Sequence, residues 1–373
     1  MSSVGLTKTE IVTLFEGSQR LLMESGEYFG PIEVAYETYG KLNSAAENAI
    51  LILHALTGDA HAAGVHSAND KVAGWWDQMV GPGRVFDTNK YFVICSNVLG
   101  SCYGTTGPAS INPSTGQPYG LSLPVVTIRD MVNVQRQLLD YLGVKRLVSV
   151  VGGSMGGMQA LEWAISFPDF IRSAVSIAAS GRLSPQGIAY NQVQRMAIMG
   201  DPGWNQGQYY GVSLPSHGLS LARMIATITY KSDQSWNAKF GRALSNPGSK
   251  LYCLESCFEV ENYLLYQGNK LVKRFDANSY LYLLKAMDLF DVGRGRESFE
   301  KALSLIDSYF LSIGISSDIL YPTYQQKELV QILRRLGKNA RYAELDSPYG
   351  HDAFLIEFKQ MGQILEKFLA SLD

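Results

Sequence analysis

A short glycine-rich segment contains a serine that could act as a nucleophile. Ser154 has Gly152 two positions before it and Gly156 two positions after it. This Gly-x-Ser-x-Gly spacing is the nucleophile-elbow pattern, in which a strand turns so sharply into a helix that larger neighbouring side chains would collide. A serine hydroxyl on such a turn can attack an acyl group. Because the chain has 36 glycines, an incidental serine in a glycine-rich turn is the alternative.

The residues on either side of Ser154 favour the catalytic interpretation. An apolar, strand-like run at 147–151 precedes it, and residues 158–164 read as a helix that continues until Pro168. The strand–turn–helix order is the context that the elbow requires. It also places the backbone N–H of Met155 at a helix N-terminus, where it can stabilise the oxyanion formed when Ser154 attacks.

A nucleophilic serine needs a base, and only one of the five histidines is suitably placed. Enzymes that carry this elbow have the chain order serine, acid, histidine. His351 is the histidine that follows both, in a loop after the strand-like run 341–345; the others are His54, His61, His66 and His217. A loop histidine exposed to solvent is the alternative interpretation of His351.

Asp318 is the predicted acid of the triad. It comes just after the strand-like run 309–313, where it could accept a hydrogen bond from the imidazole and hold one tautomer. Asp307 precedes that run and Asp346 is nearly adjacent to His351, so both are weaker candidates. The Ser-Ser-Asp setting also suits a simple turn residue. A second oxyanion donor should follow an earlier strand, and the backbone N–H of Leu56 occupies that place, whereas His54 is expected to be structural.

The elements that must position these residues indicate an α/β-hydrolase fold. Short, continuous apolar runs are typical of parallel strands covered on both faces; they lie at 49–53, 91–95, 147–151, 174–178 and 309–313. Helical patterns replace them between about 185 and 295. The Ser184-Pro185 pair predicts the start of a helix that ends near Gly200, and further helices are expected at 218–230 and 278–289. We therefore predict a mostly parallel central sheet flanked by helices, with a core of 1–184 and 296–373 and an inserted helical lid at 185–295.

Composition excludes several other classes of protein. The formal net charge is -2 and Lys and Arg are not clustered, so a nucleic-acid partner is not expected. No apolar run approaches the roughly 20 residues of a membrane span, and residues 1–10 do not resemble a signal peptide, so a soluble cytoplasmic protein is expected. The four cysteines are expected to be reduced thiols. Cys253 and Cys257 could share a helix face, but no histidine lies near them, and we assign no metal ligands.

Several segments resemble the homoserine O-acetyltransferase family of methionine biosynthesis, over nearly the whole chain. They are HALTGDAHAAG (54–64), GWWD (74–77), GGSMGGMQALEW (152–163), RFDANSY (274–280), SDILYP (317–322) and GHDAFL (350–355), and the region 293–308 matches least. The resemblance implies a ping-pong transfer of an acetyl group from acetyl-CoA to the hydroxyl of L-homoserine through an acyl-Ser154 intermediate. Acetyl-CoA is then a co-substrate, no prosthetic group is needed, and a homodimer through the lid helices is implied.

The acceptor site can be examined from spacing and from the resemblance. Arg223, Thr227 and Tyr230 fall at i, i+4 and i+7 and so share a helix face, on which an arginine could grip a carboxylate. The resemblance implies that Arg223 and Tyr230 contact homoserine; from the residues alone, Arg223 would be a surface residue. Asp352 could cap a helix beginning at Ala353, whereas the resemblance assigns it to the amino group of the substrate.

Two features leave the specificity open. Lys231 stands where the family often has an apolar residue, which could change the preference for acceptor or acyl donor, since related enzymes use serine or succinyl-CoA. A carboxylester hydrolase with the same triad is the main rival, and it would differ by letting water reach the acyl-serine. A non-catalytic member of the fold is disfavoured because Ser154, Asp318 and His351 are all present.

Overall fold

The computed structural model describes residues 4–246, 248, 251–252, 254 and 258–372. Its centre is an eight-stranded sheet with the order β1-β4-β6-β5-β9-β10-β11-β12. The strands are β1 (Glu10–Leu14), β4 (Ile32–Tyr39), β5 (Ala49–Leu53), β6 (Phe92–Ser96), β9 (Leu147–Gly153), β10 (Ser173–Ile177), β11 (Tyr309–Ile315) and β12 (Ala340–Leu345). Short hairpins pair β2 (Leu21–Leu22) with β3 (Tyr28–Phe29), and β7 (Ile111–Asn112) with β8 (Gln117–Pro118).

The parallel part of the sheet is the part that the apolar runs predicted. Along the part of the sheet with the order β6-β5-β9-β10-β11-β12, every neighbouring pair of strands is parallel. Every residue of β5 and of β10 is buried, as expected for strands covered on both faces. The sequence did not predict β1 and β4, which extend the sheet in antiparallel pairing. The fold is therefore the predicted α/β sheet with an antiparallel edge.

Helices cover both faces of this sheet. On one face lie α1 (Ile128–Tyr141), α2 (Met155–Ser166) and α9 (Thr323–Arg335), whose apolar side chains join the larger of two buried clusters. On the other face α10 (Phe358–Ala370) packs with the segment around Trp76 in the second cluster. The remaining short helices outside the lid are α8 (Phe299–Leu303) and the 3-10 helices η1 (Gly120–Ser122), η2 (Pro168–Phe170) and η4 (Gly350–Leu355).

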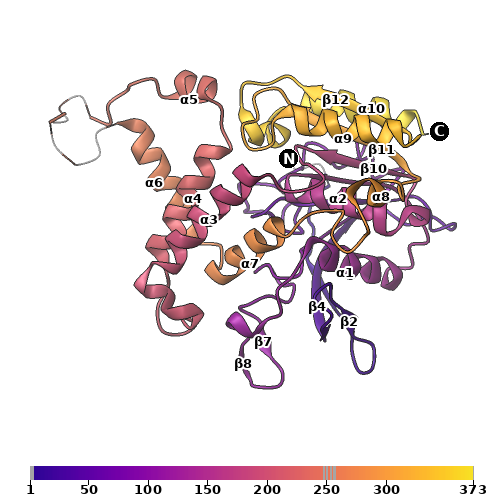
Figure 1. Ribbon diagram of the computed structural model, residues 1–373, viewed down its shortest axis with the longest axis horizontal. Coiled ribbons are helices and arrows are strands. Elements are labelled where there is room, and N and C mark those ends of the chain that lie inside the picture. The colour runs from indigo at the N-terminus through magenta and orange to yellow at the C-terminus, as the bar shows by residue number, and fades with distance from the viewer. Residues whose placement is uncertain (1–3, 247, 249–250, 253, 255–257, 373) are drawn as a thin grey trace.

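A helical segment projects from the sheet, as Figure 1 shows. It contains α3 (Pro185–Met199), η3 (Pro202–Gly207), α4 (Ser216–Thr229), α5 (Asp233–Lys239), α6 (Glu259–Val272) and α7 (Ala277–Asp288). The cap prediction for α3 is confirmed, because the Ser184 side chain accepts a hydrogen bond from the Gly187 N–H and Gly200 ends the helix. The limits of the predicted lid at 185 and 295 remain predictions.

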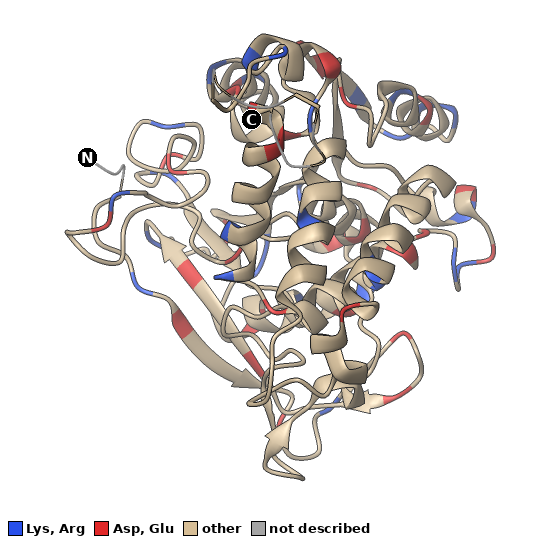
Figure 2. Ribbon diagram, turned by 90° about the vertical axis from the view of Figure 1, so that its left-hand side faces the viewer, with Lys and Arg blue, Asp and Glu red and all other residues tan. Residues whose placement is uncertain are grey.

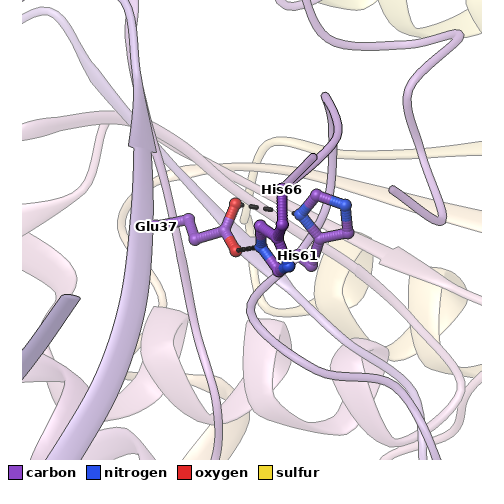
Figure 3. A group of neighbouring side chains, drawn as sticks. All are labelled: Glu37, His61 and His66. Carbon is purple, nitrogen blue, oxygen red and sulfur yellow. Dashed lines mark hydrogen bonds and ion pairs between the residues drawn. The ribbon is translucent and has the colours of Figure 1, made fainter. Parts of the chain in front are cut away.

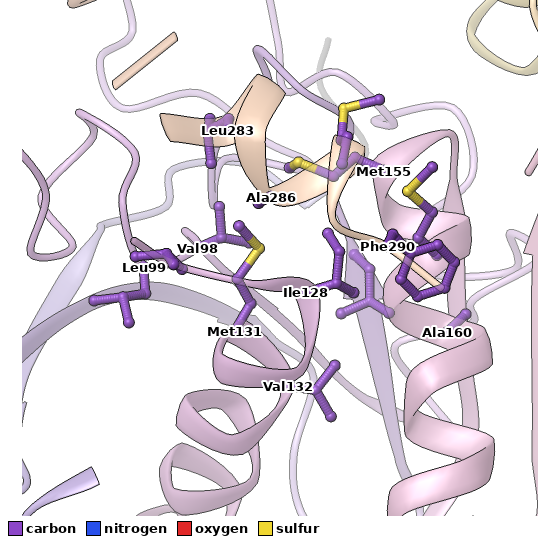
Figure 4. Close-up of a cluster of buried hydrophobic side chains, with 14 of the residues drawn as sticks. Val98, Leu99, Ile128, Met131, Val132, Met155, Ala160, Leu283, Ala286 and Phe290 are labelled. Atoms are coloured by element: carbon purple, nitrogen blue, oxygen red, sulfur yellow. The ribbon is translucent and has the colours of Figure 1, made fainter. Parts of the chain in front are cut away.

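The last of these helices, α7, packs into the core and so anchors the helical segment. Most of α7 is buried, and its Ala286 belongs to the same apolar cluster as Met131 of α1 and Ala160 of α2 (Figure 4). The more distant helices α4 and α6 approach closely where Gly268 meets Ser220, since a Cβ on Gly268 would lie 2.2 Å from the Ser220 hydroxyl. The helical segment thus has one helix in the core and others that extend beyond the sheet.

Charged residues of both signs are spread over the described part of the chain. Basic and acidic residues are interspersed over the elements visible in Figure 2. Among the described residues, none of the helices combines the length and the apolar character needed to cross a bilayer.

Candidate active site

Ser154 lies on a sharp turn between β9 and α2, at the carboxyl end of a central strand. Its backbone has φ 57° and ψ -123°, a conformation that non-glycine residues rarely adopt. A Cβ on Gly152 would lie 2.5 Å from the Gly156 carbonyl carbon, and one on Gly156 would lie 2.1 Å from the Leu53 carbonyl oxygen. Glycine is therefore required on both sides of the serine, as the elbow pattern predicts.

The structure pairs His351 with Asp318. The Nδ1 of His351 lies 2.7 Å from an Asp318 carboxylate oxygen. The other Asp318 oxygen accepts hydrogen bonds from the backbone N–H groups of Leu320 and Tyr321, at 2.8 and 2.9 Å. This arrangement holds the carboxylate still, because both of its oxygens are engaged.

The two competing aspartates have other partners. Asp307 lies 2.7 Å from the Lys338 ammonium group, and Asp346 accepts a hydrogen bond from the Ser316 hydroxyl at 2.9 Å. Among the three aspartates, Asp318 is the one whose carboxylate contacts the His351 ring. It follows the end of β11 and His351 lies in η4, so two separate connections at the carboxyl edge of the sheet supply the pair.

Burial and charge act in opposite directions on His351. Burial alone would lower the pKa of His351, but the Asp318 carboxylate, through its charge and its hydrogen bond, outweighs this effect, and the pKa is raised. The ring is stacked on Tyr321 with centroids 5.3 Å apart and meets Phe354 edge-on at 5.8 Å. Its Nε2 is buried and makes no hydrogen bond within the described residues. That nitrogen is the one a triad would use as the base.

Ser154 lines a small enclosed cavity of about 20 Å³. Leu56, Tyr230 and Tyr321 are among its other lining residues. Tyr321 also stacks on the His351 ring, and the Tyr230 ring lies 5.8 Å from that ring, centroid to centroid. The structure thus places the serine and the His351–Asp318 pair around the same few aromatic side chains. No hydrogen bond joins the Ser154 hydroxyl to His351 in the described part of the chain.

The two predicted oxyanion donors lie on the elements that the sequence indicated. Met155 is the first residue of α2, so its N–H has no partner within the helix. Leu56 follows β5 and lines the cavity with Ser154. Neither N–H is used in a hydrogen bond by any of the described residues. Both groups are available to an oxyanion formed at Ser154.

His54 is structural, as expected. It is fully buried, its Nε2 accepts a hydrogen bond from the Val98 N–H at 3.1 Å, and its Nδ1 lies 2.8 Å from the Ala55 carbonyl oxygen. A carbonyl oxygen can only accept, which puts the proton on Nδ1 and leaves the ring neutral. Burial also lowers the pKa of His54. The ring therefore holds the turn that leads to Leu56.

The structure brings together only some of the residues predicted to bind the acyl-acceptor substrate. Tyr230 lines the Ser154 cavity, and the Arg223 guanidinium carbon lies 5.5 Å from the centre of its ring. Arg223 itself does not line the cavity. Thr227, on the same predicted face, donates its hydroxyl hydrogen to the Arg223 carbonyl oxygen at 2.8 Å and is buried. The Arg223 guanidinium and the Tyr230 phenol are thus adjacent, whereas the Thr227 hydroxyl is used in a hydrogen bond within its own helix.

The structure excludes one of the two roles considered for Asp352, that of a helix cap. The 3-10 helix begins at Gly350, so Asp352 lies inside it and does not cap a helix that starts at Ala353; that interpretation was wrong. The backbone N–H of Asp352 donates to the Tyr230 carbonyl oxygen at 3.2 Å. Its carboxylate lies 3.4 Å from the ammonium group of Lys231. Lys231 is therefore a neighbour of this candidate substrate-binding carboxylate.

The structure also groups residues that sequence reasoning missed. Glu37 of β4 comes together with His61 and His66 of one loop, and the distance in sequence between the glutamate and the histidines left no local pattern that joins all three. Cys95 and Cys102 are free thiols, as expected, whereas the pair Cys253 and Cys257 falls outside the described residues.

Comparisons with known proteins agree with this geometry. Residues 48–357 match a family model described as the alpha/beta hydrolase fold. The chain is 61% identical over 368 residues to the homoserine O-acetyltransferase of Carboxydothermus hydrogenoformans, covering 98% of this chain and 96% of that protein. The chain belongs to the homoserine O-acetyltransferase family.

Solved structures related to this family include both a transferase and an esterase. The homoserine O-acetyltransferase of Bacillus anthracis has a TM-score of 0.91 at 32% identity, with 98% of each chain covered. Esterase E22 has a TM-score of 0.90 at 31% identity, covering 98% of this chain and all of the other. The fold alone therefore does not distinguish an alcohol acceptor from water, whereas the match at higher identity favours the transferase family.

Proposed function

We propose that this chain transfers an acetyl group from acetyl-CoA to the hydroxyl of L-homoserine. The observation that carries the proposal is the 61% identity, over almost the full length, to a homoserine O-acetyltransferase. Support comes from the ordered Asp318–His351 pair and from Ser154 on its elbow. No cofactor is required, since acetyl-CoA enters as a co-substrate, and an enzyme that uses it with a free amino acid would act in the cytoplasm.

The first half-reaction loads the acetyl group on Ser154. His351 Nε2 takes the hydroxyl proton while the serine oxygen attacks the thioester carbonyl carbon. The negative charge that develops on the carbonyl oxygen is stabilised by the N–H groups of Leu56 and Met155. The carbon–sulfur bond then breaks, and the proton held by His351 passes to the coenzyme A sulfur.

The second half-reaction reverses these roles. The homoserine hydroxyl gives its proton to His351 Nε2, and its oxygen attacks the acetyl carbonyl of the acyl-serine. When the ester bond to Ser154 breaks, His351 returns the proton to the serine oxygen. Asp318 stays ionised throughout and stabilises the imidazolium that forms in each half-reaction.

The acceptor is held by groups beside Tyr230. The Arg223 guanidinium can donate two parallel hydrogen bonds to the carboxylate of homoserine, and Tyr230 lies next to it. Asp352 offers the amino group a carboxylate. For this contact, the ammonium group of the substrate must displace that of Lys231.

A matrix of donors and acceptors tests the proposal. Acetyl-CoA and succinyl-CoA are each combined with L-homoserine and L-serine, and thiol release is measured with and without acceptor. Acetyl-CoA with homoserine should give the highest turnover, and Ser154→Ala should abolish it. If thiol release is equal with and without homoserine, the chain is a hydrolase; turnover that survives Ser154→Ala contradicts the mechanism.

We further propose that two chains associate through the lid helices. Support comes from apolar side chains that α3 exposes to solvent, among them Val193 at 54% and Met196 at 57% of their full exposure. Side chains of this kind, three residues apart on a helix, form one apolar strip. Such a strip is typical of a protein–protein contact.

A further inference from the structure

A carboxylate and two imidazole rings meet in the first part of the connection that follows β5. Glu37 belongs to β4, while His61 and His66 belong to the loop between β5 and β6 (Figure 3). The His61 Nδ1 lies 3.1 Å from one Glu37 carboxylate oxygen, and the His66 Nε2 lies 2.7 Å from the other. The two rings are 4.0 Å apart, centroid to centroid. None of these residues takes part in the proposed acetyl transfer.

The donor set and its spacing suit a small divalent metal ion. Two imidazole nitrogens and one carboxylate oxygen are a ligand set that zinc uses in proteins. Tetrahedral zinc with bonds of about 2.1 Å needs donor atoms roughly 3.4 Å apart. The three donor atoms here all lie within 4.8 Å of one another. Small side-chain rotations would therefore place them around one ion.

Further hydrogen bonds hold the carboxylate in position. Glu37 is fully buried, and its oxygens accept hydrogen bonds from the Thr9 hydroxyl at 2.8 Å and the Tyr39 hydroxyl at 3.0 Å. Partners of this kind behind a ligand orient it and increase metal affinity.

An ion could reach this group from solvent. The His66 side chain is 46% exposed and that of His61 is 19% exposed, whereas Glu37 forms the buried base of the group. In the arrangement drawn in Figure 3, both rings donate to an acceptor-only carboxylate. A bound ion would replace the protons on His61 Nδ1 and His66 Nε2. Those protons would move to the other nitrogen of each ring or to solvent.

We propose that Glu37, His61 and His66 bind one Zn²⁺ ion, with water as the fourth ligand, and that this ion stabilises the fold. The ion joins β4 to the loop that also carries Leu56 and Trp76. Trp76 donates a hydrogen bond to the Phe354 carbonyl oxygen at 3.1 Å, which connects this loop to η4. Zinc therefore stabilises the folded chain and the connection that carries a predicted oxyanion donor.

Calorimetric titration of the chelator-treated full chain with Zn²⁺ tests the site. The wild type should bind one equivalent and gain thermal stability. His66→Ala and His61→Ala should each lose this binding, while His217→Ala, which removes an exposed histidine on α4, should keep it. Far-ultraviolet circular dichroism of each variant shows whether it is folded, and His66→Ala is the safer variant because its side chain is the more exposed.

Cobalt provides a second readout that identifies the ligands. Co²⁺ in a site of nitrogen and oxygen donors gives visible d–d bands without the thiolate charge-transfer band that a cysteine ligand adds. We expect those bands in the wild type and in His217→Ala, and not in His66→Ala. Absence of zinc binding by the wild type, unchanged binding by folded His66→Ala, or a thiolate band would each overturn the proposal. These outcomes are independent of acetyl transfer, which is measured separately.

Discussion

At the scale of single residues, the environment of His351 sets the conditions under which it can act as a base. The ring is buried, which disfavours its charged form, but it lies 2.7 Å from the Asp318 carboxylate, which favours that form. The second influence is stronger, so that the pKa of His351 is raised above its ordinary value of 6.5. The protonated ring cannot accept the hydroxyl proton of Ser154.

The pH dependence of turnover follows from this shift. Since the neutral ring is the active form, kcat/KM should fall as the pH decreases through a pKa above 6.5. Asp318→Asn should move this acid limb to lower pH, because the carboxylate that raises the pKa is gone. It should also reduce kcat on the order of 10⁴-fold, since the amide cannot hold the required tautomer. An acid limb that stays in place in Asp318→Asn would contradict this account of His351.

Lys231 is expected to compete with the substrate for Asp352. Its ammonium group lies 3.4 Å from that carboxylate, and neither side chain is more than one third exposed. An ion pair of this kind is worth about 0.2–1 kcal/mol, so Lys231→Met should lower the KM for homoserine by roughly 1.4- to fivefold. Steady-state kinetics with varied homoserine measure this effect, and Lys270→Met, at an exposed lysine of α6, is the control. A higher KM in Lys231→Met would show that the lysine itself helps to bind the acceptor.

At the scale of elements, the close contact between α2 and β5 fixes the position of Ser154. Gly156, in the first turn of α2, has no room for a side chain, because a Cβ would lie 2.1 Å from the Leu53 carbonyl oxygen. The chain between β9 and α2 can therefore turn sharply only if the helix approaches the neighbouring strand at a glycine. The same approach brings Ser154 beside Leu56, which follows β5.

Gly156→Ala tests this contact. Pushing the helix away from β5 should cost about 1–3 kcal/mol of the free energy of unfolding and lower kcat, because Ser154 moves relative to the oxyanion donors. Urea denaturation and steady-state kinetics measure the two effects. Gly248→Ala is the matched control, since a Cβ there would come no closer than 3.8 Å to the Asn246 side chain. Unchanged stability and activity of Gly156→Ala would show that the first turn of α2 can shift freely.

At the scale of the whole molecule, the helices that project from the sheet carry an apolar surface. Val193 and Met196 of α3 are more than half exposed, although they belong to a helix that packs on α4 and α7. A dimer through this surface would remove those side chains from water, and each fully buried side chain of this size contributes about 1.5–3 kcal/mol. Burial of Val193 and Met196 in each copy would therefore supply a large part of the free energy of dimer formation.

A double substitution tests the dimer. Val193→Glu combined with Met196→Glu should convert the dimer to a monomer, because two charges in each copy would face an apolar contact. Sedimentation velocity measures the change in mass. Tyr141→Glu introduces a charge at a 57% exposed position of α1, outside the lid, and should leave the dimer intact. A dimer that survives the double substitution would place the contact elsewhere.

The sequence by itself determined the features that depend on neighbours along the chain. The spacing of Gly152, Ser154 and Gly156 predicted the elbow, because the steric demand of that turn acts within a few residues. The continuous apolar runs predicted the parallel strands, since a strand covered on both faces is apolar throughout. The Ser184-Pro185 pair predicted the start of α3 because a helix cap is a local hydrogen bond.

The choice between equivalent residues was left to the tertiary structure. Position along the chain favoured Asp318 over Asp307 and Asp346, but the contact itself depends on packing that brings the connection after β11 against η4, where the Asp318 carboxylate meets His351. The position of Asp352 depended on where the 3-10 helix begins, and the proximity of Lys231 depended on the contact between the lid and η4. Glu37 and the two histidines come from separate segments, so their meeting is a property of the sheet and its loops. Contacts between distant segments are set by the packing of the whole chain, which leaves no periodic trace in the sequence.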